Sequence, residues 1–279
     1  MGKSMGDEMT IHPDDGIPLK RSDFDTQEEY YWTYQYKLAA GYYIPLLNAH
    51  GFRIDEKRIL DIGCGLGGFP AAMADKGAAE SVGIEIDSDI RRPSTINRPN
   101  LRYIFEDITS ADALERVGTN YDLIVLHDVI EHVPLVQKEQ FLSALKQFCH
   151  PGTLMLVTFP PFYSPFGLHQ QSLLKSRLRV VPFLGWVPLW SLKPILRLLA
   201  EDANAYDLLK EIKDSRMTIR RFKKLLVRLG FSVEFEQYYL VRPTHEIRYG
   251  WRTRISSIKN TPVLSEVANS GALYLVRLV

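Results

Sequence analysis

One stretch, residues 58–87, constrains the fold of this chain more than any other. It begins with the apolar sequence ILDI and runs directly into a glycine-rich segment, GCGLGG, at residues 63–68. An apolar run followed by glycines predicts a buried parallel strand that turns sharply into a helix, which should begin near Gly68. A second strand is expected over residues 81–86, and Glu85 stands near its end. An acid about twenty residues past such a loop is the arrangement that holds an adenosine ribose by its hydroxyls.

The glycines alone do not name the ligand. Gly63, Gly65 and Gly68 fit the dinucleotide pattern G-x-G-x-x-G, while the tighter pattern G-x-G-x-G ends at Gly67. The residue that discriminates is Asp61, which stands two residues before the first glycine. Its carboxylate would repel a pyrophosphate and attract the ammonium group of an amino-acid moiety.

At these residues the chain resembles the class I S-adenosylmethionine-dependent methyltransferases, whose first motif reads much like LDIGCGLG at residues 60–67. A second block, YDLIVLHDVIEHV at residues 121–133, resembles the fourth-strand motif of the same family. The resemblance covers roughly residues 58–159. It implies a doubly wound α/β fold with helices on both faces of a seven-stranded, mostly parallel sheet of order 3-2-1-4-5-7-6, whose last strand is antiparallel. The implied cofactor is S-adenosylmethionine.

The resemblance also implies roles for single residues. Asp61 and Gly63 would meet the methionine portion of the cofactor, and Gly65 would let the backbone approach it closely. Glu85 would hold the ribose hydroxyls, and Asp107 would read the adenine, although Asp107 could instead cap a helix that begins just after it. The implied cofactor-binding set is Asp61, Gly63, Cys64, Gly65, Gly67, Glu85, Ile86, Asp107, Ile108 and His127.

Composition narrows the remaining choices. The chain has 279 residues, 46% of them hydrophobic and 24% charged, as is usual for a globular protein with a sizeable core. A net charge of +1 argues against a broad nucleic-acid footprint, so no nucleic-acid partner is expected. Cys64 and Cys149 lie in no C-x-x-C motif or His/Cys cluster, which predicts a reducing compartment and no structural metal. The polar first twenty residues do not read as a signal peptide, and a cytoplasmic protein is predicted.

The expected elements follow in chain order. Further strands are predicted at 101–105, 121–126, 154–159, 231–241 and 272–279, and helices at 87–100, 133–148 and 218–229. The predicted organisation is a mobile arm (1–24) followed by a single methyltransferase domain with an N-terminal helical cap (25–57), a cofactor-binding core (58–159), an insert (160–217) and a closing helix with two strands (218–279). In the cap, a spacing of four places Tyr30, Tyr34, Leu38 and Tyr42 on one helix face. That face either packs against the core or roofs the site.

The insert at residues 160–217 interrupts the regular alternation of strands and helices. It is rich in proline and aromatic residues, including Trp186 and Trp190, and its prolines argue against one long helix. Its apolar part is too short to span a bilayer. Three roles remain open: a lid over an apolar or amphiphilic substrate, a peripheral membrane contact through residues 178–200, or an oligomer contact. The oligomeric state itself is not predicted.

Methyl transfer from a sulfonium is an in-line displacement that by itself requires no metal and no covalent enzyme intermediate. An alcohol or amine acceptor must lose a proton, and histidine is the natural proton acceptor near neutral pH. Among the candidates His127, His132, His169 and His245, we select His169 and His127 as the catalytic candidates. The predicted function is methyl transfer to a small molecule, most readily to an oxygen of an amphiphilic, lipid or glycan-type acceptor.

Two rival functions remain. A nicotinamide-dependent oxidoreductase is disfavoured by Asp61 and by the two closing strands after the last helix. A non-catalytic module that binds the nucleotide for regulation would keep the same loop without turnover.

Overall fold

The structure is a computed structural model that describes residues 18–90, 98–259 and 261–278. Most of the predicted mobile arm, part of the helix expected at 87–100, and Val279 lie outside these residues. The chain divides into two compact units. Unit 1 contains the described residues up to Leu123 together with Pro243–Arg252, and unit 2 contains Ile124–Arg242 and the described residues from Thr253 onward.

Eight strands of the described chain form a sheet of order β3-β2-β1-β4-β5-β8-β6-β7. They are β1 (Arg58–Ile62), β2 (Glu80–Glu85), β3 (Leu101–Phe105), β4 (Tyr121–His127), β5 (Cys149–Phe159), β6 (Phe231–Val241), β7 (Arg254–Ile255) and β8 (Gly271–Leu278). Strands β1, β2 and β3 pair in parallel, whereas β8 runs antiparallel to both β5 and β6. The predicted fold class and the order of the seven long strands are confirmed. The difference is β7, an edge strand of two residues, which is too short to leave a periodic signal in the sequence.

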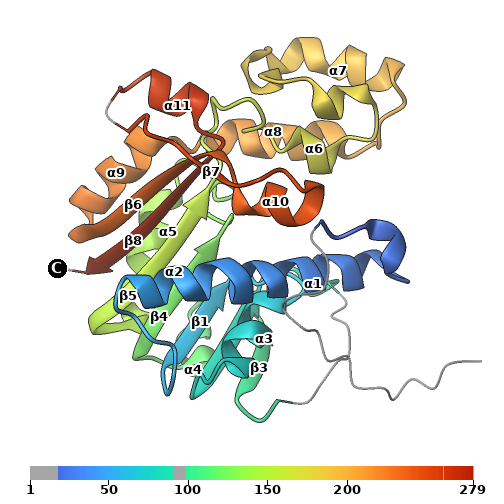
Figure 1. Cartoon of the computed structure of the whole chain (residues 1–279). Helices are drawn as coiled ribbons and strands as arrows, with labels where there is room; N and C mark the ends of the chain where they lie inside the picture. The colour runs from blue at the N-terminus through green and yellow to red at the C-terminus, as the bar shows by residue number, and fades with distance from the viewer. Residues whose placement is uncertain (1–17, 91–97, 260, 279) are drawn as a thin grey trace, which may run out of the picture. The chain divides into compact units, whose positions relative to one another are not determined.

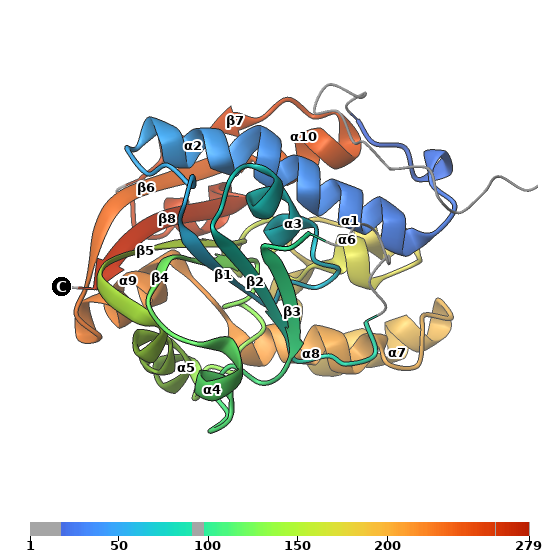
Figure 2. The ribbon, with the colours of Figure 1, turned by 90° about the horizontal axis from the view of Figure 1, so that it is seen from below.

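Each unit also contains helices. They are α1 (Gln27–Leu38), α2 (Ile44–Ala49), α3 (Gly68–Asp75), α4 (Ala113–Val117) and α10 (Pro243–Tyr249) in unit 1, and α5 (Lys138–Ala144), α6 (Gln170–Leu173), α7 (Leu189–Leu198), α8 (Ala205–Ser215), α9 (Ile219–Arg228) and α11 (Leu264–Ala268) in unit 2. Short 3-10 turns lie at Arg21–Asp23, Leu145–Phe148, Arg177–Val180 and Leu184–Trp186. In unit 1, α1 runs into α2 as one long helix that packs beside α3 (Figures 1 and 2).

The start of α1 is fixed by a capping box. The hydroxyl of Thr26 accepts from the Glu29 backbone N–H at 3.1 Å, and the Glu29 carboxylate accepts from the Thr26 backbone N–H at 3.3 Å. Further along, residues 39–43 form a π-helical turn, which inserts one residue into the helical repeat. Tyr43 is buried and Tyr42 is half-buried in this turn, so the packed surface of the helix continues past Leu38.

The core of unit 2 is aromatic where α9 meets the antiparallel strands. The ring of Phe222 on α9 lies 5.2 Å from that of Phe159 on β5 and 4.9 Å from that of Tyr274 on β8. The helix expected at 133–148 begins only at Lys138. Its first predicted turn is a loop because the buried Lys138 ammonium binds backbone carbonyls there, as described below.

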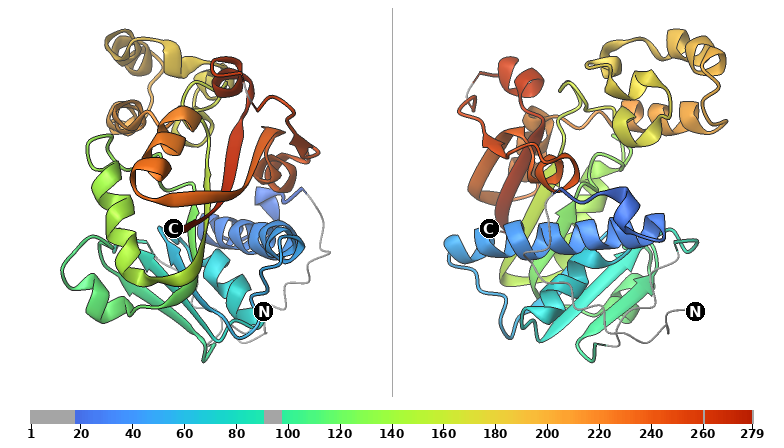
Figure 3. Two further views of the ribbon diagram at one scale, coloured as in Figure 1. Left: turned by 90° about the vertical axis from the view of Figure 1, so that its left-hand side faces the viewer. Right: turned by 45° about the vertical axis from the view of Figure 1, so that its right-hand side comes forward.

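The insert folds as a small helical layer with its own core. Figure 3 shows α6, α7 and α8 gathered together within unit 2. Their buried side chains are Phe162, Leu168, Leu174, Leu184, Leu192, Leu196, Ala205, Leu209 and Ile212. No helix in the described ranges is both long and apolar enough to cross a bilayer. The sequence did not predict α8, whose apolar residues are interleaved with charged ones.

Candidate functional site

The glycine loop of unit 1 requires its glycines. Gly63, Gly65 and Gly67 have φ angles of 68°, 53° and 85°, in the left-handed region that side chains disfavour. A β-carbon at Gly67 would also come within 2.3 Å of the ring of Tyr103. The Tyr103 hydroxyl donates to the Gly67 carbonyl at 2.7 Å, so β3 fixes the far side of the loop.

The carboxylate of Glu85 joins the loop to the end of β2. Its Oε2 accepts from the Gly65 N–H at 2.8 Å, and its Oε1 accepts from the N–H groups of Ile86 at 2.9 Å and Asp87 at 3.2 Å. Glu85 is buried, whereas the neighbouring Ile86 is 70% exposed. The Glu85 carboxylate and the exposed Ile86 side chain therefore lie together beside the glycines, where the ribose is expected to bind.

The cap helix α1 reaches the same loop through Gln35. Its Nε2 donates to the Cys64 carbonyl at 3.2 Å, and its Oε1 accepts from the Gly68 N–H at 3.3 Å. A β-carbon at Gly68 would lie 2.1 Å from the Trp32 carbonyl oxygen, so α1 lies directly on the start of α3. Gln35 could not be predicted, since one glutamine on a helix gives no signal of a contact made 29 residues further along the chain.

The two predicted aspartates of unit 1 are in different environments. Asp61 is buried on β1 and lies in register with Gly83 of β2. Asp107 is half-buried, and its Oδ1 accepts from both the N–H and the hydroxyl of Thr109 at 2.8 Å. Asp107 thus closes a turn, and α4 begins only at Ala113. Its role toward adenine stays a prediction.

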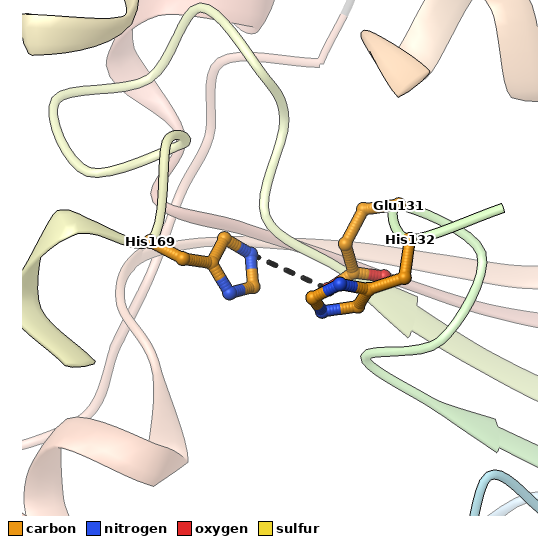
Figure 4. A group of neighbouring side chains, drawn as sticks. All are labelled: Glu131, His132 and His169. Atoms are coloured by element: carbon orange, nitrogen blue, oxygen red, sulfur yellow. Dashed lines mark ion pairs between the residues drawn. The ribbon is translucent and has the colours of Figure 1, made fainter. Parts of the chain in front are cut away.

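In unit 2, Glu131, His132 and His169 form a cluster, which we call the acid–histidine cluster (Figure 4). One ligand-type atom from each residue lies within 4.8 Å of the others. Glu131 is 2% exposed, and neither of its carboxylate oxygens has a hydrogen-bond partner among the described residues. The His169 Nε2 lies 3.5 Å from the Glu131 Oε1. Two histidines and a carboxylate are a ligand set that suits zinc and other divalent cations.

Burial sets the protonation of this cluster. Burial, followed by the nearby Asp128, raises the pKa of Glu131 to about 8. Burial, followed by His132, lowers the pKa of His169 to about 3, so its imidazole is neutral at physiological pH. Burial would lower the pKa of His132, but its contact with Glu211 at 3.3 Å raises it overall.

An ion pair stands next to the cluster. Asp128 has a φ of 55° and accepts from the Arg242 guanidinium at 2.5 Å and from the Thr158 hydroxyl at 3.0 Å. Burial alone would raise the pKa of Asp128, yet Arg242 holds it well below its usual range. No pattern in the sequence indicates this pair, because Arg242 lies 114 residues after Asp128.

Lys138 fixes the loop that carries Glu131 and His132. Its side chain is fully buried, and its ammonium donates to the carbonyls of Ile130 and Val133 and to the Ser215 hydroxyl. Burial lowers its pKa to about 7. His127, at the end of β4, also has a pKa lowered by burial, and its catalytic role stays a prediction.

Comparison with known proteins identifies the family. A family model described as "Methyltransferase domain" matches residues 31–234, which is more than half of the chain. The chain belongs to this methyltransferase domain family. The prediction of a class I S-adenosylmethionine-dependent methyltransferase is thereby confirmed, with S-adenosylmethionine as its cofactor. This result favours methyl transfer over the nicotinamide-dependent alternative.

Several curated proteins are similar to this chain over part of its length. An uncharacterized methyltransferase of Mycobacteroides abscessus is 28% identical over 130 residues, which cover 45% of this chain and 48% of the relative. A ubiquinone biosynthesis O-methyltransferase of Rickettsia typhi is 29% identical over 147 residues, 53% of this chain and 56% of the relative. The chain therefore spans about half the length of these relatives. A protein of the same name from Rickettsia canadensis is 26% identical over 220 residues, 73% of this chain and 84% of the relative.

A solved structure is similar in fold. The plantazolicin methyltransferase BpumL in complex with SAH has a TM-score of 0.52 and 14% sequence identity, and the match covers 88% of this chain and 85% of that one. At this level of identity the likeness supports the fold alone.

Proposed function

We propose that the protein transfers the methyl group of S-adenosylmethionine to an oxygen of a small amphiphilic acceptor of lipid or glycan type. The observation that carries the proposal is the acid–histidine cluster, in which a buried carboxylate without a hydrogen-bond donor faces a neutral imidazole. Such a cluster suits the binding of a hydroxyl, and with a cation held there it would lower the pKa of that hydroxyl. Relatives named ubiquinone biosynthesis O-methyltransferases support oxygen as the acceptor atom.

For the cofactor we propose the contacts implied by the family motifs. Asp61, Gly63 and Gly65 would hold the methionine portion, Glu85 the ribose hydroxyls, and Asp107 the adenine. Supporting this assignment, the Glu85 carboxylate is already held beside the glycines by the Gly65 N–H. The exposed side chain of Ile86 offers an apolar face for a flat base or sugar.

We propose that Glu131, His132 and His169 bind a divalent cation, in place of the metal-free reaction expected from the sequence. The Glu131 oxygens and the His169 Nε2 are buried and make no hydrogen bond with any described residue, and they fit this role because buried polar atoms need a partner. A bound cation would lower the pKa of an acceptor hydroxyl. A pKa of about 3 makes His169 a weak proton acceptor, which favours it as a ligand over its predicted role as general base.

The remaining residues of the site position this cluster. Lys138 holds the loop after β4 through two backbone carbonyls, and Arg242 neutralises Asp128 beside it. We further propose that residues 160–217 act as a lid over the acceptor.

A peripheral membrane contact through residues 178–200, on the cytoplasmic face, fits the exposure of Trp186 and Trp190.

The test of the acceptor class uses a labelled methyl donor. The full chain is incubated with S-adenosylmethionine carrying a labelled methyl group and with a cell extract, and the extract is then partitioned between organic and aqueous phases. Label in small molecules, with formation of S-adenosylhomocysteine, supports the proposal. Label found solely in protein or nucleic acid contradicts the acceptor class, and no turnover with any extract favours the regulatory module.

The cation is tested separately by calorimetry with magnesium, manganese and zinc salts on the protein saturated with cofactor. Glu131→Gln and His169→Asn should each weaken cation binding by at least about tenfold, because replacing even an outer-shell partner of a metal ligand costs about 10- to 100-fold. The control is Glu139→Gln, which changes an exposed acid paired with Arg228. Equal binding by all variants would contradict the assigned ligands.

A further inference from the structure

Unit 2 carries two adjoining pockets whose linings include none of the residues of the acid–histidine cluster. Their volumes are about 1010 Å³ and about 740 Å³, and both are lined by Arg220, Lys224, Pro262 and Glu266. We call them together the basic groove. It is formed by α9, by α11, by the end of α8 and by the loop before α7 that carries Trp186.

The basic groove concentrates positive charge in a chain whose net charge is only +1. Among the described lining residues, the cations are Lys213, Arg216, Arg220, Arg221, Lys223, Lys224, Arg228 and Lys259, and the acids are Asp214 and Glu266. Both acids are already engaged. Glu266 accepts from the backbone N–H groups of Ile219 at 2.9 Å and Arg220 at 2.8 Å, and Asp214 pairs with Lys210 at 2.5 Å. The groove therefore presents an uncompensated positive potential.

Several of these cations have no partner within the described part of the chain. Lys223 pairs with Glu236, and Arg228 pairs with Glu139. The side chains of Arg220, Lys224 and Lys259 make no hydrogen bond or ion pair with any described residue. Their charges are thus available to an external anion.

Apolar side chains alternate with these cations. Trp186, Val227 and Val263 line the groove and are 54%, 79% and 77% exposed. The loop that bears Trp186 is held by Lys213, whose buried ammonium donates to the carbonyls of Gly185 and Val187, both at 2.7 Å. Tryptophan and aliphatic side chains among lysines and arginines are typical of a surface that enters the headgroup layer of a bilayer. The phosphate backbone of a nucleic acid would make no favourable contact with these exposed aliphatic side chains.

We propose that the basic groove binds the phosphate headgroups of an anionic lipid bilayer, with Trp186, Val227 and Val263 entering the interfacial layer. Arg220, Lys224 and Lys259 contact the phosphates. This surface shares the segment around Trp186 with the proposed lid but contains none of the residues proposed to bind the cofactor or the cation, and it assigns a specific partner and place to the membrane contact. An acceptor of lipid character would be met at this surface, but the binding does not depend on turnover.

The test is co-sedimentation of the full chain with vesicles of phosphatidylcholine alone or mixed with phosphatidylglycerol. Binding is expected to the mixed vesicles only and should fall as salt is raised, because exposed charges are screened. The double variant Arg220→Glu/Lys224→Glu should weaken binding by at least about tenfold. Trp186→Ala should weaken it less, by about threefold or more, through lost interfacial contact.

The matched control is Arg53→Glu/Lys76→Glu, which makes the same charge change at exposed positions of unit 1. It should bind vesicles like the unchanged protein, and all variants should bind S-adenosylmethionine equally, which shows that they are folded. The proposal is overturned if the Arg220→Glu/Lys224→Glu variant binds vesicles normally, or if the control loses binding to the same extent. It is also overturned if the protein does not co-sediment with the mixed vesicles while inorganic phosphate or a single-stranded RNA binds in the groove.

Discussion

The carboxylate of Glu85 has two tasks, and they can be separated by substitution. It accepts three backbone N–H groups in the protein, and we propose that it also receives the ribose hydroxyls. Glu85→Ala should weaken binding of S-adenosylmethionine by roughly 1 to 3 kcal/mol, the scale of hydrogen bonds to a charged group. Isothermal calorimetry measures the affinity, and the melting temperature without cofactor reports loop stability. Unchanged affinity would remove the ribose assignment.

The raised pKa of Glu131 predicts how the stability of the protein depends on pH. Its pKa is raised from 4.5 to about 8 in the folded chain, so between these values the folded state holds a proton that the unfolded state has lost. This group therefore destabilises the fold as pH rises through that window. Glu131→Gln removes the effect, so the variant should gain stability over the unchanged protein between about pH 5 and pH 8, by a few kcal/mol at most.

Urea unfolding without added cations, at several pH values, measures this difference. The difference also contains the response of His132 and Lys138, because the charge of Glu131 raises the pKa of both groups. Glu139→Gln is the control, because its exposed ion pair with Arg228 should change stability little and equally across the range. A Glu131→Gln difference that stays constant with pH would contradict the raised pKa.

At the scale of elements, the contact of α1 with α3 depends on one missing side chain. A β-carbon at Gly68 would meet the Trp32 carbonyl at 2.1 Å and the Tyr36 backbone nitrogen at 2.8 Å. Gly68→Ala should therefore push the helices apart and destabilise the fold by about 1 to 3 kcal/mol, the usual cost of overpacking. The control Gly41→Ala adds the same methyl group where nothing lies within 4 Å. Chemical denaturation of both variants measures the difference, and equal stabilities would argue against the close contact.

The strands were predictable because their signals are local. The apolar runs before the glycine loop and in β3, β4 and β6 each fall within one element, and the helix starts at Thr26, Gly68 and Thr218 carry their own capping or glycine signals. The late start of α5 was not predictable. It depends on Lys138 reaching Ser215, 77 residues away, and a single lysine gives no pattern of that contact.

The site divides in the same way. The glycines and Glu85 follow from spacing along one stretch of chain, and the structure brings them together within unit 1. The acid–histidine cluster needed the fold, since Glu131 and His132 are adjacent but His169 comes from the loop before α6, with a φ of 57°. Neither the proximity of these three residues nor the burial of Glu131 could be derived from periodicity.

At the scale of the whole molecule, the cofactor assignment predicts where binding stabilises the chain. Every residue proposed to hold S-adenosylmethionine, apart from His127, lies in unit 1. A ligand at about one hundred times its dissociation constant stabilises the bound form by about 2.7 kcal/mol, and the effect concentrates in the segments whose opening releases the ligand. Amide hydrogen exchange should therefore slow most in β1, α3 and β2. The helical insert at residues 160–217 has its own buried core and should change least. If cofactor slowed amide exchange equally in the insert and in the glycine loop, the result would contradict a cofactor held by unit 1. The insert would then have to open together with the cofactor-binding residues.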